Sequence, residues 1–161
     1  MKKPILLIFI TYFFFLALPW AEAALGIEAF GGWNQSIGAS DLSAGAGSDL
    51  NSTYSSVNNS TLINITGAQG VNRDWRVDVN RVGGSWDANL RIYVRRTGDG
   101  TGTGTVSDGL NYIEATTTGN YFFQGSDLRS SIPVQYQLQG ASLNVLANTY
   151  NTSVVFTVTR R

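Results

Sequence analysis

Apolar side chains recur at every second position in several stretches of this chain. Segment 75–80 alternates apolar with polar residues, and segment 86–95 repeats the pattern over a longer span, with Trp75 and Trp86 among the apolar positions. Because successive side chains of a β-strand point to opposite faces, each segment predicts a strand with one buried face. The pair Gly83-Gly84 between them suits the positive-φ positions of a tight turn, so the two strands are predicted to form a hairpin.

The remaining strand signals extend this pattern along the chain. Segment 132–138 alternates in the same way, and Pro133 predicts that this strand lies at a sheet edge or begins there, because proline cannot donate a ladder hydrogen bond. Segment 150–159 predicts a strand that ends close to the C-terminus. Weaker signals cover 25–30, 62–66, 110–115 and 121–124. With about seven or eight short strands and no helical period with caps, the chain is predicted to be all-β, as an immunoglobulin-like antiparallel β-sandwich, with a closed barrel as the alternative.

Residues 1–23 have a different character. Two lysines precede an apolar stretch over 5–18, Pro19 follows it, and the small-residue triplet Ala21-Glu22-Ala23 comes next. This order is typical of a secretory signal-peptide helix that is cleaved after Ala23. The apolar stretch is shorter than the roughly 20 residues that a membrane-spanning helix needs. The mature chain is therefore predicted to have no membrane span and to be secreted, at the cell surface or extracellular, with the periplasm as a further option.

The rest of the chain divides by composition. Residues 24–60 begin with a strand-like stretch and continue as a polar arm rich in Gly, Ser and Asn, a mixture that buries little surface per ordered residue. Residues 61–161 hold the stronger strand signals and are predicted to be the sandwich domain, so that 24–161 form one domain if the arm packs on it. In segment 97–105 glycine occupies alternate positions. That spacing matches neither a dinucleotide- nor a phosphate-binding loop, and the segment is interpreted as a flexible hairpin tip.

The residue types present limit the chemistry. Eleven Lys and Arg balance eleven Asp and Glu, and the chain has no histidine and no cysteine. This balance gives no electrostatic reason to expect a nucleic-acid partner. The usual hydrolase nucleophile and base pairs, and the usual zinc and copper sites, lack their residues. We therefore expect a non-enzymatic protein with no catalytic residue, cofactor or metal ligand set. Two alternatives stay open, a glycosidic carboxylate pair and calcium bound by loop aspartates, and the carboxylates considered for the pair are Asp87, Asp99, Asp108 and Glu114.

Aromatic side chains mark a candidate ligand surface. On the polar face of the strand over 86–95, Arg91, Tyr93 and Arg95 form a flat row that suits stacking on a sugar or contact with an acidic partner. Trp33 is a further stacking candidate. The run Tyr121-Phe122-Phe123 places aromatics on both faces of its strand, which predicts a strand covered on both sides or an exposed patch used for association.

The beginning of the mature chain is a candidate assembly strand. Its apolar residues Leu25, Ile27 and Phe30 could add a strand to a neighbouring subunit, or the same segment could pair within its own sheet. Two further signals favour association through strand edges. They are the edge predicted from Pro133 and the strand predicted at the end of the chain.

Two segments resemble a known family. Segment 70–79, Gly-Val-Asn-Arg-Asp-Trp-Arg-Val-Asp-Val, resembles a stretch of bacterial WxL-type surface domains. Segment 148–159 is similar to the Gly-Thr-Tyr closing strand found there and in spore-coat-U-like and pilin-like sandwiches, with Asn148 where glycine is usual. The resemblance implies a cell-surface or extracellular immunoglobulin-like sandwich and brings no catalytic residues. We therefore expect a structural or adhesive surface protein that assembles with itself or with other envelope proteins, and a glycan-binding module is the alternative.

Overall fold

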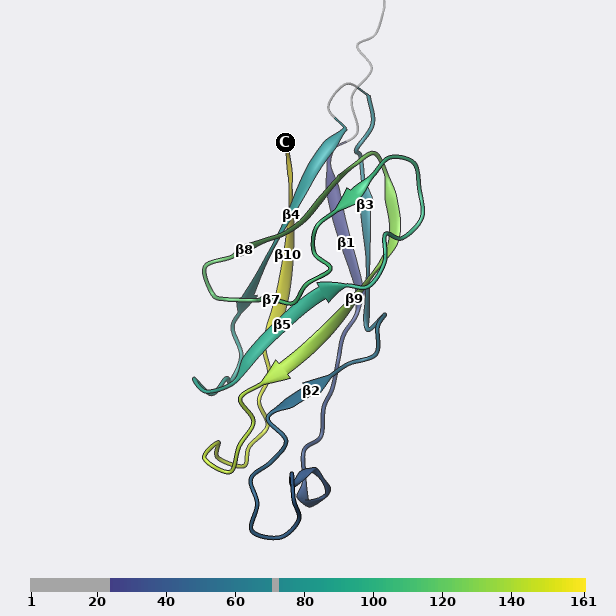
Figure 1. The fold of residues 1–161 in the computed structure, drawn as a ribbon. Coiled ribbons are helices and arrows are strands. Elements are labelled where there is room, and N and C mark those ends of the chain that lie inside the picture. Colours follow the sequence, from purple (N-terminus) through teal and green to yellow (C-terminus); the bar gives the residue numbers. More distant parts are fainter. Residues whose placement is uncertain (1–23, 71–72) are drawn as a thin grey trace, which may run out of the picture.

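The computed structural model describes residues 24–70 and 73–161 and shows two antiparallel β-sheets packed together (Figure 1). The first, sheet A, contains β1 (Gly26–Gly31), β2 (Thr53–Ser55), β3 (Thr61–Thr66), β5 (Arg91–Arg96), β7 (Ile113–Glu114) and β9 (Arg129–Gln139). The second, sheet B, contains β4 (Asp74–Val82), β6 (Val106–Ser107), β8 (Asn120–Ser126) and β10 (Ser153–Arg160). A 3-10 turn, η1 (Ala39–Asp41), lies in the loop between β1 and β2. The predicted all-β sandwich is confirmed, and the signal peptide predicted over 1–23 lies outside the described residues.

Large apolar side chains from the inner faces of the two sheets form the core. Trp75, Val77 and Val79, the predicted buried face of β4, have no solvent exposure. The Trp75 ring meets the Phe123 ring edge to face at a centroid separation of 5.8 Å, and its Nε1 donates a 2.8 Å hydrogen bond to the Asp127 carbonyl. Because the chain has no cysteine to cross-link it, this apolar burial is the main source of its stability.

Phe122 and Phe123 are consecutive, and yet both are fully buried. The register between β4 and β8 shifts at this point, since Val77 pairs with Phe123 and Asp78 pairs with Tyr121. Phe122 is therefore the extra residue of a β-bulge. The bulge brings both phenylalanine rings into the core with their centroids 4.8 Å apart. The exposed patch, one of the two options that the sequence left open, therefore does not form.

β4 and β5 do not form the hairpin predicted around Gly83-Gly84. Both glycines have a positive φ, 61° and 82°, but β4 lies in sheet B and β5 lies in sheet A. The turn therefore carries the chain from one sheet to the other, and residues 83–90 contain no strand. Alternation shows only that a strand has one buried face, which holds equally for neighbours in one sheet and for strands that face each other across the core.

β9 is the central strand of sheet A and begins at Arg129, so the prediction from Pro133 that this strand lies at a sheet edge or begins there is wrong. β3 and β2 pair with β9 along one side, and β5 pairs along the other. Pro133 lies just beyond the last residue of β5 and faces Thr97, whose N–H donates a 2.9 Å hydrogen bond to the Pro133 carbonyl. Because proline has no N–H, only the return hydrogen bond from residue 133 to Thr97 is missing, and it would lie at the end of the β5–β9 pairing.

The glycine-rich segment 97–105 is not a hairpin tip. It leads from β5 in sheet A to β6 in sheet B and runs along the backbone of residues 126–130, where Thr101 and Ser130 exchange hydrogen bonds of 2.8 and 2.9 Å. A Cβ at three of its positions would overlap a carbonyl oxygen of that backbone: Gly100, Gly102 and Gly104. Glycine recurs at alternate positions because this side of the segment lies against a neighbouring backbone.

Both ends of the predicted arm pair within sheet A. β1 pairs antiparallel with β3 from Gly26–Thr66 to Gly31–Thr61, and β2 pairs with β9. The polar residues between them form a loop that contains η1. The candidate assembly strand is thus paired within its own chain, which was the second of the two options left open by the sequence.

Replacing Gly102 by alanine should destabilise the protein by about 1–3 kcal/mol, because its φ is 136° and a Cβ would overlap the Leu128 carbonyl oxygen. Equilibrium urea unfolding followed by tryptophan fluorescence measures this change. Gly32→Ala is the matched control, since a Cβ at Gly32 has no neighbour within 4 Å, and its free energy of unfolding should stay within about 0.5 kcal/mol of the wild-type value. Wild-type stability of the Gly102 variant would contradict the close backbone contact.

Tyr121 makes stability depend on alkaline pH. Its hydroxyl donates a hydrogen bond to the Asp108 carboxylate, and burial, then this bond and the Asp108 charge, raise the pKa of Tyr121 from 10.0 to about 12. The folded state favours the neutral phenol, so this group stabilises the fold below pH 10, and the stabilisation is lost as the pH rises through 12. Urea unfolding at a series of pH values should show the free energy of unfolding falling across this window, and falling less in Tyr121→Phe. Identical pH profiles for the two proteins would contradict the raised pKa.

Candidate functional site

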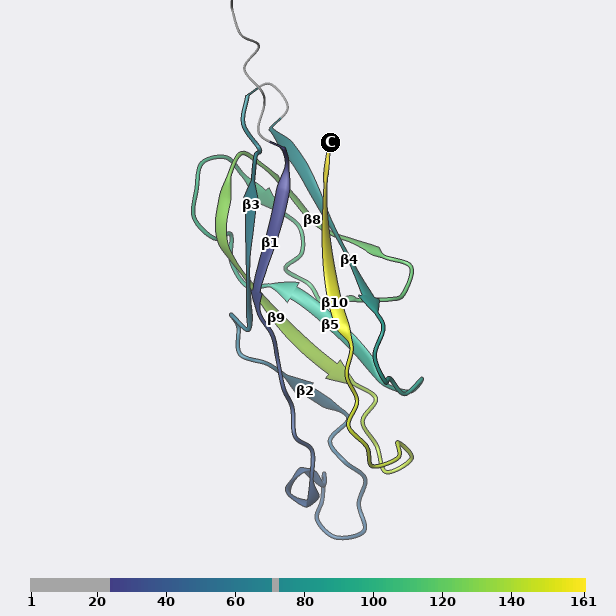
Figure 2. The same cartoon turned by 180° about the vertical axis from the view of Figure 1, so that it is seen from behind.

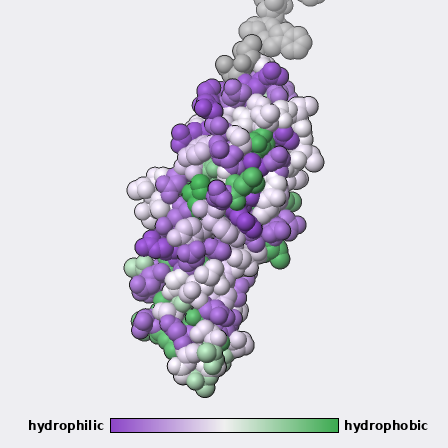
Figure 3. All heavy atoms as spheres, in the orientation of Figure 1, coloured by the Kyte–Doolittle hydropathy of each residue, from purple (hydrophilic) through white to green (hydrophobic). Residues whose placement is uncertain are grey.

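The arginine–tyrosine row predicted from the sequence lies on the outer face of sheet A. Arg91 forms an ion pair with Glu114 of β7, with 2.9 Å between Nη1 and Oε1. Tyr93 lies between Glu114 and Gln137 in the sheet register, and its hydroxyl makes no hydrogen bond within the described part of the chain. Figure 3 shows the side of the molecule in the orientation of Figure 1, where hydrophilic and intermediate residues predominate and hydrophobic residues form small separate groups.

Arg95, the third residue of the row, is committed to neighbouring side chains. Its Nε donates a 2.8 Å hydrogen bond to Gln135 Oε1, and its guanidinium lies 4.8 Å from the centroid of the Tyr112 ring. The Tyr112 hydroxyl donates to the same Gln135 oxygen at 3.0 Å. These contacts fix the Arg95 side chain on the sheet face. They therefore limit how its guanidinium could contact a ligand.

Trp33 is not part of this row. It lines a cleft between the two sheets together with Ile92 and Tyr136. Ile92 and Tyr93 are neighbours in β5 and therefore point to opposite faces of the sheet. The structure thus brings Arg91, Tyr93 and Arg95 together and places Trp33 on the other side of sheet A.

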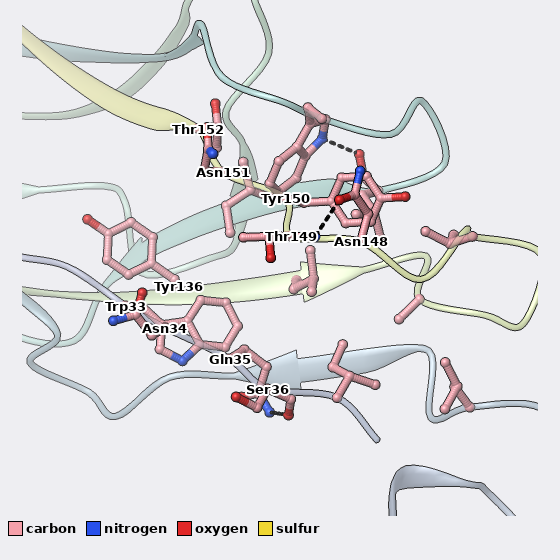
Figure 4. A pocket seen from close by; sticks show the side chains of 18 of the residues that line it. Trp33, Asn34, Gln35, Ser36, Tyr136, Asn148, Thr149, Tyr150, Asn151 and Thr152 are labelled. Atoms are coloured by element: carbon pink, nitrogen blue, oxygen red, sulfur yellow. Dashed lines mark hydrogen bonds between the residues drawn. The ribbon is translucent and has the colours of Figure 1, made fainter. Parts of the chain in front are cut away.

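The cleft that contains Trp33 has a volume of about 1330 Å³ and lies where β1 ends and β10 begins. We call it the inter-sheet cleft. Its floor is the inner face of β5 and β9, and its walls are the loop over 31–42 and the loop over 141–153. Figure 4 shows Trp33 projecting from the first loop and Tyr150 from the second, with Tyr136 of β9 between the two segments. In Figure 3 one group of hydrophobic residues lies at the lower end of the molecule, where Figure 1 shows the loops below β2 and β9.

Aromatic side chains in the inter-sheet cleft are held by contacts within the chain. Trp86 Nε1 donates a 2.8 Å hydrogen bond to the Leu90 carbonyl, and the Arg81 guanidinium lies over the Trp86 ring at 5.2 Å from its centroid. The Tyr150 hydroxyl donates a 2.7 Å bond to the Leu146 carbonyl. Trp33 packs against both apolar clusters of the core, and its Nε1 has no hydrogen-bond partner among the described residues. The sequence signal for this site was the tryptophans. Trp33 was predicted as a stacking residue but was grouped with Tyr93, alternation assigned Trp86 to the core, and no prediction covered the loop before β10.

The described lining of the inter-sheet cleft has no charged side chain. The lining residues that the structure describes include tryptophans, tyrosines, aliphatic residues, asparagines, glutamine, serines and threonines, and none of them is Asp, Glu, Lys or Arg. The cleft therefore presents aromatic rings together with neutral hydrogen-bonding groups, and none of its described lining side chains offers a counter-charge to an ion.

A second feature is the pair of long edge strands on one side of the sandwich. β1 ends sheet A, β10 ends sheet B, and the two run side by side in opposite directions in the foreground of Figure 2. Leu25 and Ile27 pack against the core from this side, as do Val154, Phe156 and Val158, and all five remain partly exposed. Phe30, in contrast, is 56% exposed and lies on the opposite face of β1, because its spacing from Ile27 is odd.

The carboxylates considered for acid–base or metal chemistry each have local partners. Asp99 pairs with Arg96, Asp108 accepts from Tyr121, and Glu114 pairs with Arg91. Asp87 accepts a 2.8 Å hydrogen bond from the Asn89 N–H. Over residues 24–70 and 73–161, no group of three metal-ligating side chains lies close enough together to hold an ion.

Comparison with known proteins adds no family assignment. Among the described residues, no helix is long and apolar enough to cross a membrane. No protein-family model matches the chain, and no curated protein matches it either. The function is therefore argued from the edge strands, the sheet face and the inter-sheet cleft.

Proposed function

We propose that this protein is a non-enzymatic structural or adhesive component of the cell surface or extracellular space, with an immunoglobulin-like sandwich that assembles with copies of itself by strand addition. The observation that carries the proposal is the contrast between the two sides of the sandwich. On one side the sheets end in β6 and β7, which are two residues long each. On the other side they end in β1 and β10, which are six and eight residues long. Short edges resist pairing with another chain, and long regular edges favour it.

β10 is the better of the two acceptor edges. It pairs with β4 over all eight residues without a register shift, so no bulge twists its free edge away. Residues 153–159 contain no proline and no charged side chain, and five of them are β-branched valine or threonine on either side of Phe156. Every second residue of an antiparallel edge strand directs its N–H and C=O away from its one partner, which makes β10 a template for a further strand.

A second copy of the chain is the partner that supplies a matching edge. Residues 24–161 contain nine basic and ten acidic residues, so two copies of the mature chain repel each other little by net charge. Pairing of β10 with β10 of another copy closes a dimer, whereas pairing of β10 with β1 of the next copy continues into a filament. The signal-peptide pattern over 1–23 supports an extracellular setting for either assembly.

Glycan binding by the outer face of sheet A is the alternative proposal. What favours it is that Tyr93 lies partly exposed on this face and that its hydroxyl has no hydrogen-bond partner among the described residues. Arg91 and Arg95, however, are engaged by Glu114 and by Gln135. We therefore rank this face below the edge strands.

Val155→Lys should weaken self-association at least tenfold, because a charge on the β10 edge opposes pairing with another strand. Val155 lies on the outer face of β10 and is partly exposed, so the substitution leaves the core unchanged. Light scattering across a concentration series, with negative-stain microscopy, should show a wild-type mass that grows with concentration.

Val57→Lys is the matched control for this prediction. Val57 is 69% exposed and lies outside the strands, so its variant should associate as the wild type does. A wild-type protein that is monomeric at every concentration would overturn the proposal, and equal effects of the two lysines would show that association does not use β10.

A further inference from the structure

We infer that the inter-sheet cleft is a binding site for a neutral oligosaccharide. The inference is independent of strand addition, because the free edge of β10 is formed by backbone groups and the cleft is formed by loop and core side chains. It concerns a surface other than the outer face of sheet A, since Trp33 and Tyr93 lie on opposite sides of that sheet.

Hydrogen bonds fix the loops that form the walls of the cleft. The Leu143 N–H donates a 2.7 Å bond to Asp49 Oδ1, which ties the loop before β10 to the loop after β1. Within the loop before β10, the Tyr150 hydroxyl is fixed on the Leu146 carbonyl. On the floor, Leu90, Ile92 and Tyr136 are each less than one-tenth exposed. A site braced in this way loses little conformational entropy when a ligand enters.

The lining decides the class of ligand. Because none of the described lining residues carries a charge, an anionic or cationic ligand would leave water without gaining a counter-charge. Among the described lining residues, a nucleic acid would find no cation for its phosphates. A purely hydrocarbon ligand would leave the amide and hydroxyl groups along the loops without partners. A neutral sugar satisfies both parts of the lining, because its C–H faces pack on aromatic rings and its hydroxyl groups exchange hydrogen bonds with neutral amides.

Particular side chains supply these two kinds of contact. Trp33 and Trp86 offer ring surface, and Arg81 covers one face of Trp86, which orients that ring. Trp33 Nε1 has no partner within the described chain and is a free donor. Gln35 is exposed at the rim, and the bond from its Nε2 to the Ser36 carbonyl leaves its Oε1 free to accept. Asn148 Oδ1 accepts from the Thr149 N–H, which leaves the Asn148 NH₂ free to donate.

The test uses the purified protein with a panel of neutral hexasaccharides, namely β-1,4-, β-1,3- and α-1,4-linked glucose, mannose and xylose oligomers, beside oligogalacturonate and a heparin hexasaccharide. Calorimetry and tryptophan fluorescence measure binding. At least one neutral oligomer should bind and shift the tryptophan emission, and the charged oligomers should bind more weakly. Trp33→Ala should lower the affinity about tenfold or more. Gln35→Ala, which removes only an exposed side chain, should lower it several-fold.

Two controls keep the result interpretable. Tyr93→Ala, on the other side of sheet A, should bind the oligosaccharide with wild-type affinity. Because Trp33 also packs on the core, its variant is used together with urea unfolding, and Gln35→Ala provides a readout that does not depend on the core. The inference is overturned if no neutral oligomer binds, if Tyr93→Ala abolishes binding, or if neither cleft variant changes the affinity.

The experiment also separates this inference from the proposed assembly. Trp33→Ala should retain the wild-type mass distribution in light scattering, and Val155→Lys should retain wild-type sugar affinity. Loss of self-association in Trp33→Ala without a change in sugar binding would overturn the inference and would show that a second copy occupies the cleft.

Discussion

Packing between the two sheets is the interaction on which the rest of this structure depends. The chain has no cysteine, so no cross-link holds the layers together. Trp75, Phe122 and Phe123 fill the centre, and the first of these is located by its hydrogen bond to the Asp127 carbonyl. Gly125 belongs to the same arrangement, because a Cβ there would overlap the Thr105 carbonyl oxygen and would lie 2.6 Å from the Trp75 ring. Glycine is unfavourable inside a strand, but at this position the close packing of the Trp75 ring and the neighbouring backbone leaves no room for a Cβ.

Strands cover the core at one end of the sandwich, and loops replace the edge strands at the other. Where β1 and β10 run side by side, inner-face residues from both strands pack on the core. Beyond Gly31 and before Ser153 the strands end and long loops take over, and the inter-sheet cleft opens between those loops. The proposed assembly edge and the proposed sugar site are therefore two consequences of the same architecture, one at the backbone edge and the other at the open end.

Glycine and proline occur at several positions for reasons other than the ones that their usual local roles suggest. Alternate glycines usually indicate flexibility, but Gly100 and Gly102 are small because each lies against a carbonyl of a neighbouring segment. Pro133 usually indicates an edge, but it is accommodated in the central strand at the point where β5 has ended. Gly83-Gly84 does form a turn, but one that changes sheets. The strand at Pro133 and the turn at Gly83-Gly84 were predicted correctly as local conformations, whereas the hairpin tip over 97–105 was not. In all three cases the sequence did not identify the neighbouring strand or segment.

What the sequence by itself determined is the class of the protein, because the two-residue period and the residue types are local properties. Alternation located β4, most of β9 and most of β10 and identified their buried faces, and the absence of His and Cys limited the available chemistry. The strand order, the bulge at Phe122 and the position of Trp33 depended on contacts between residues far apart in the chain. A period of two specifies which side chains share a face, but it carries no information on which strand lies beside another. Only the tertiary structure decided that pairing, and with it the long edge at β10 and the uncharged aromatic cleft.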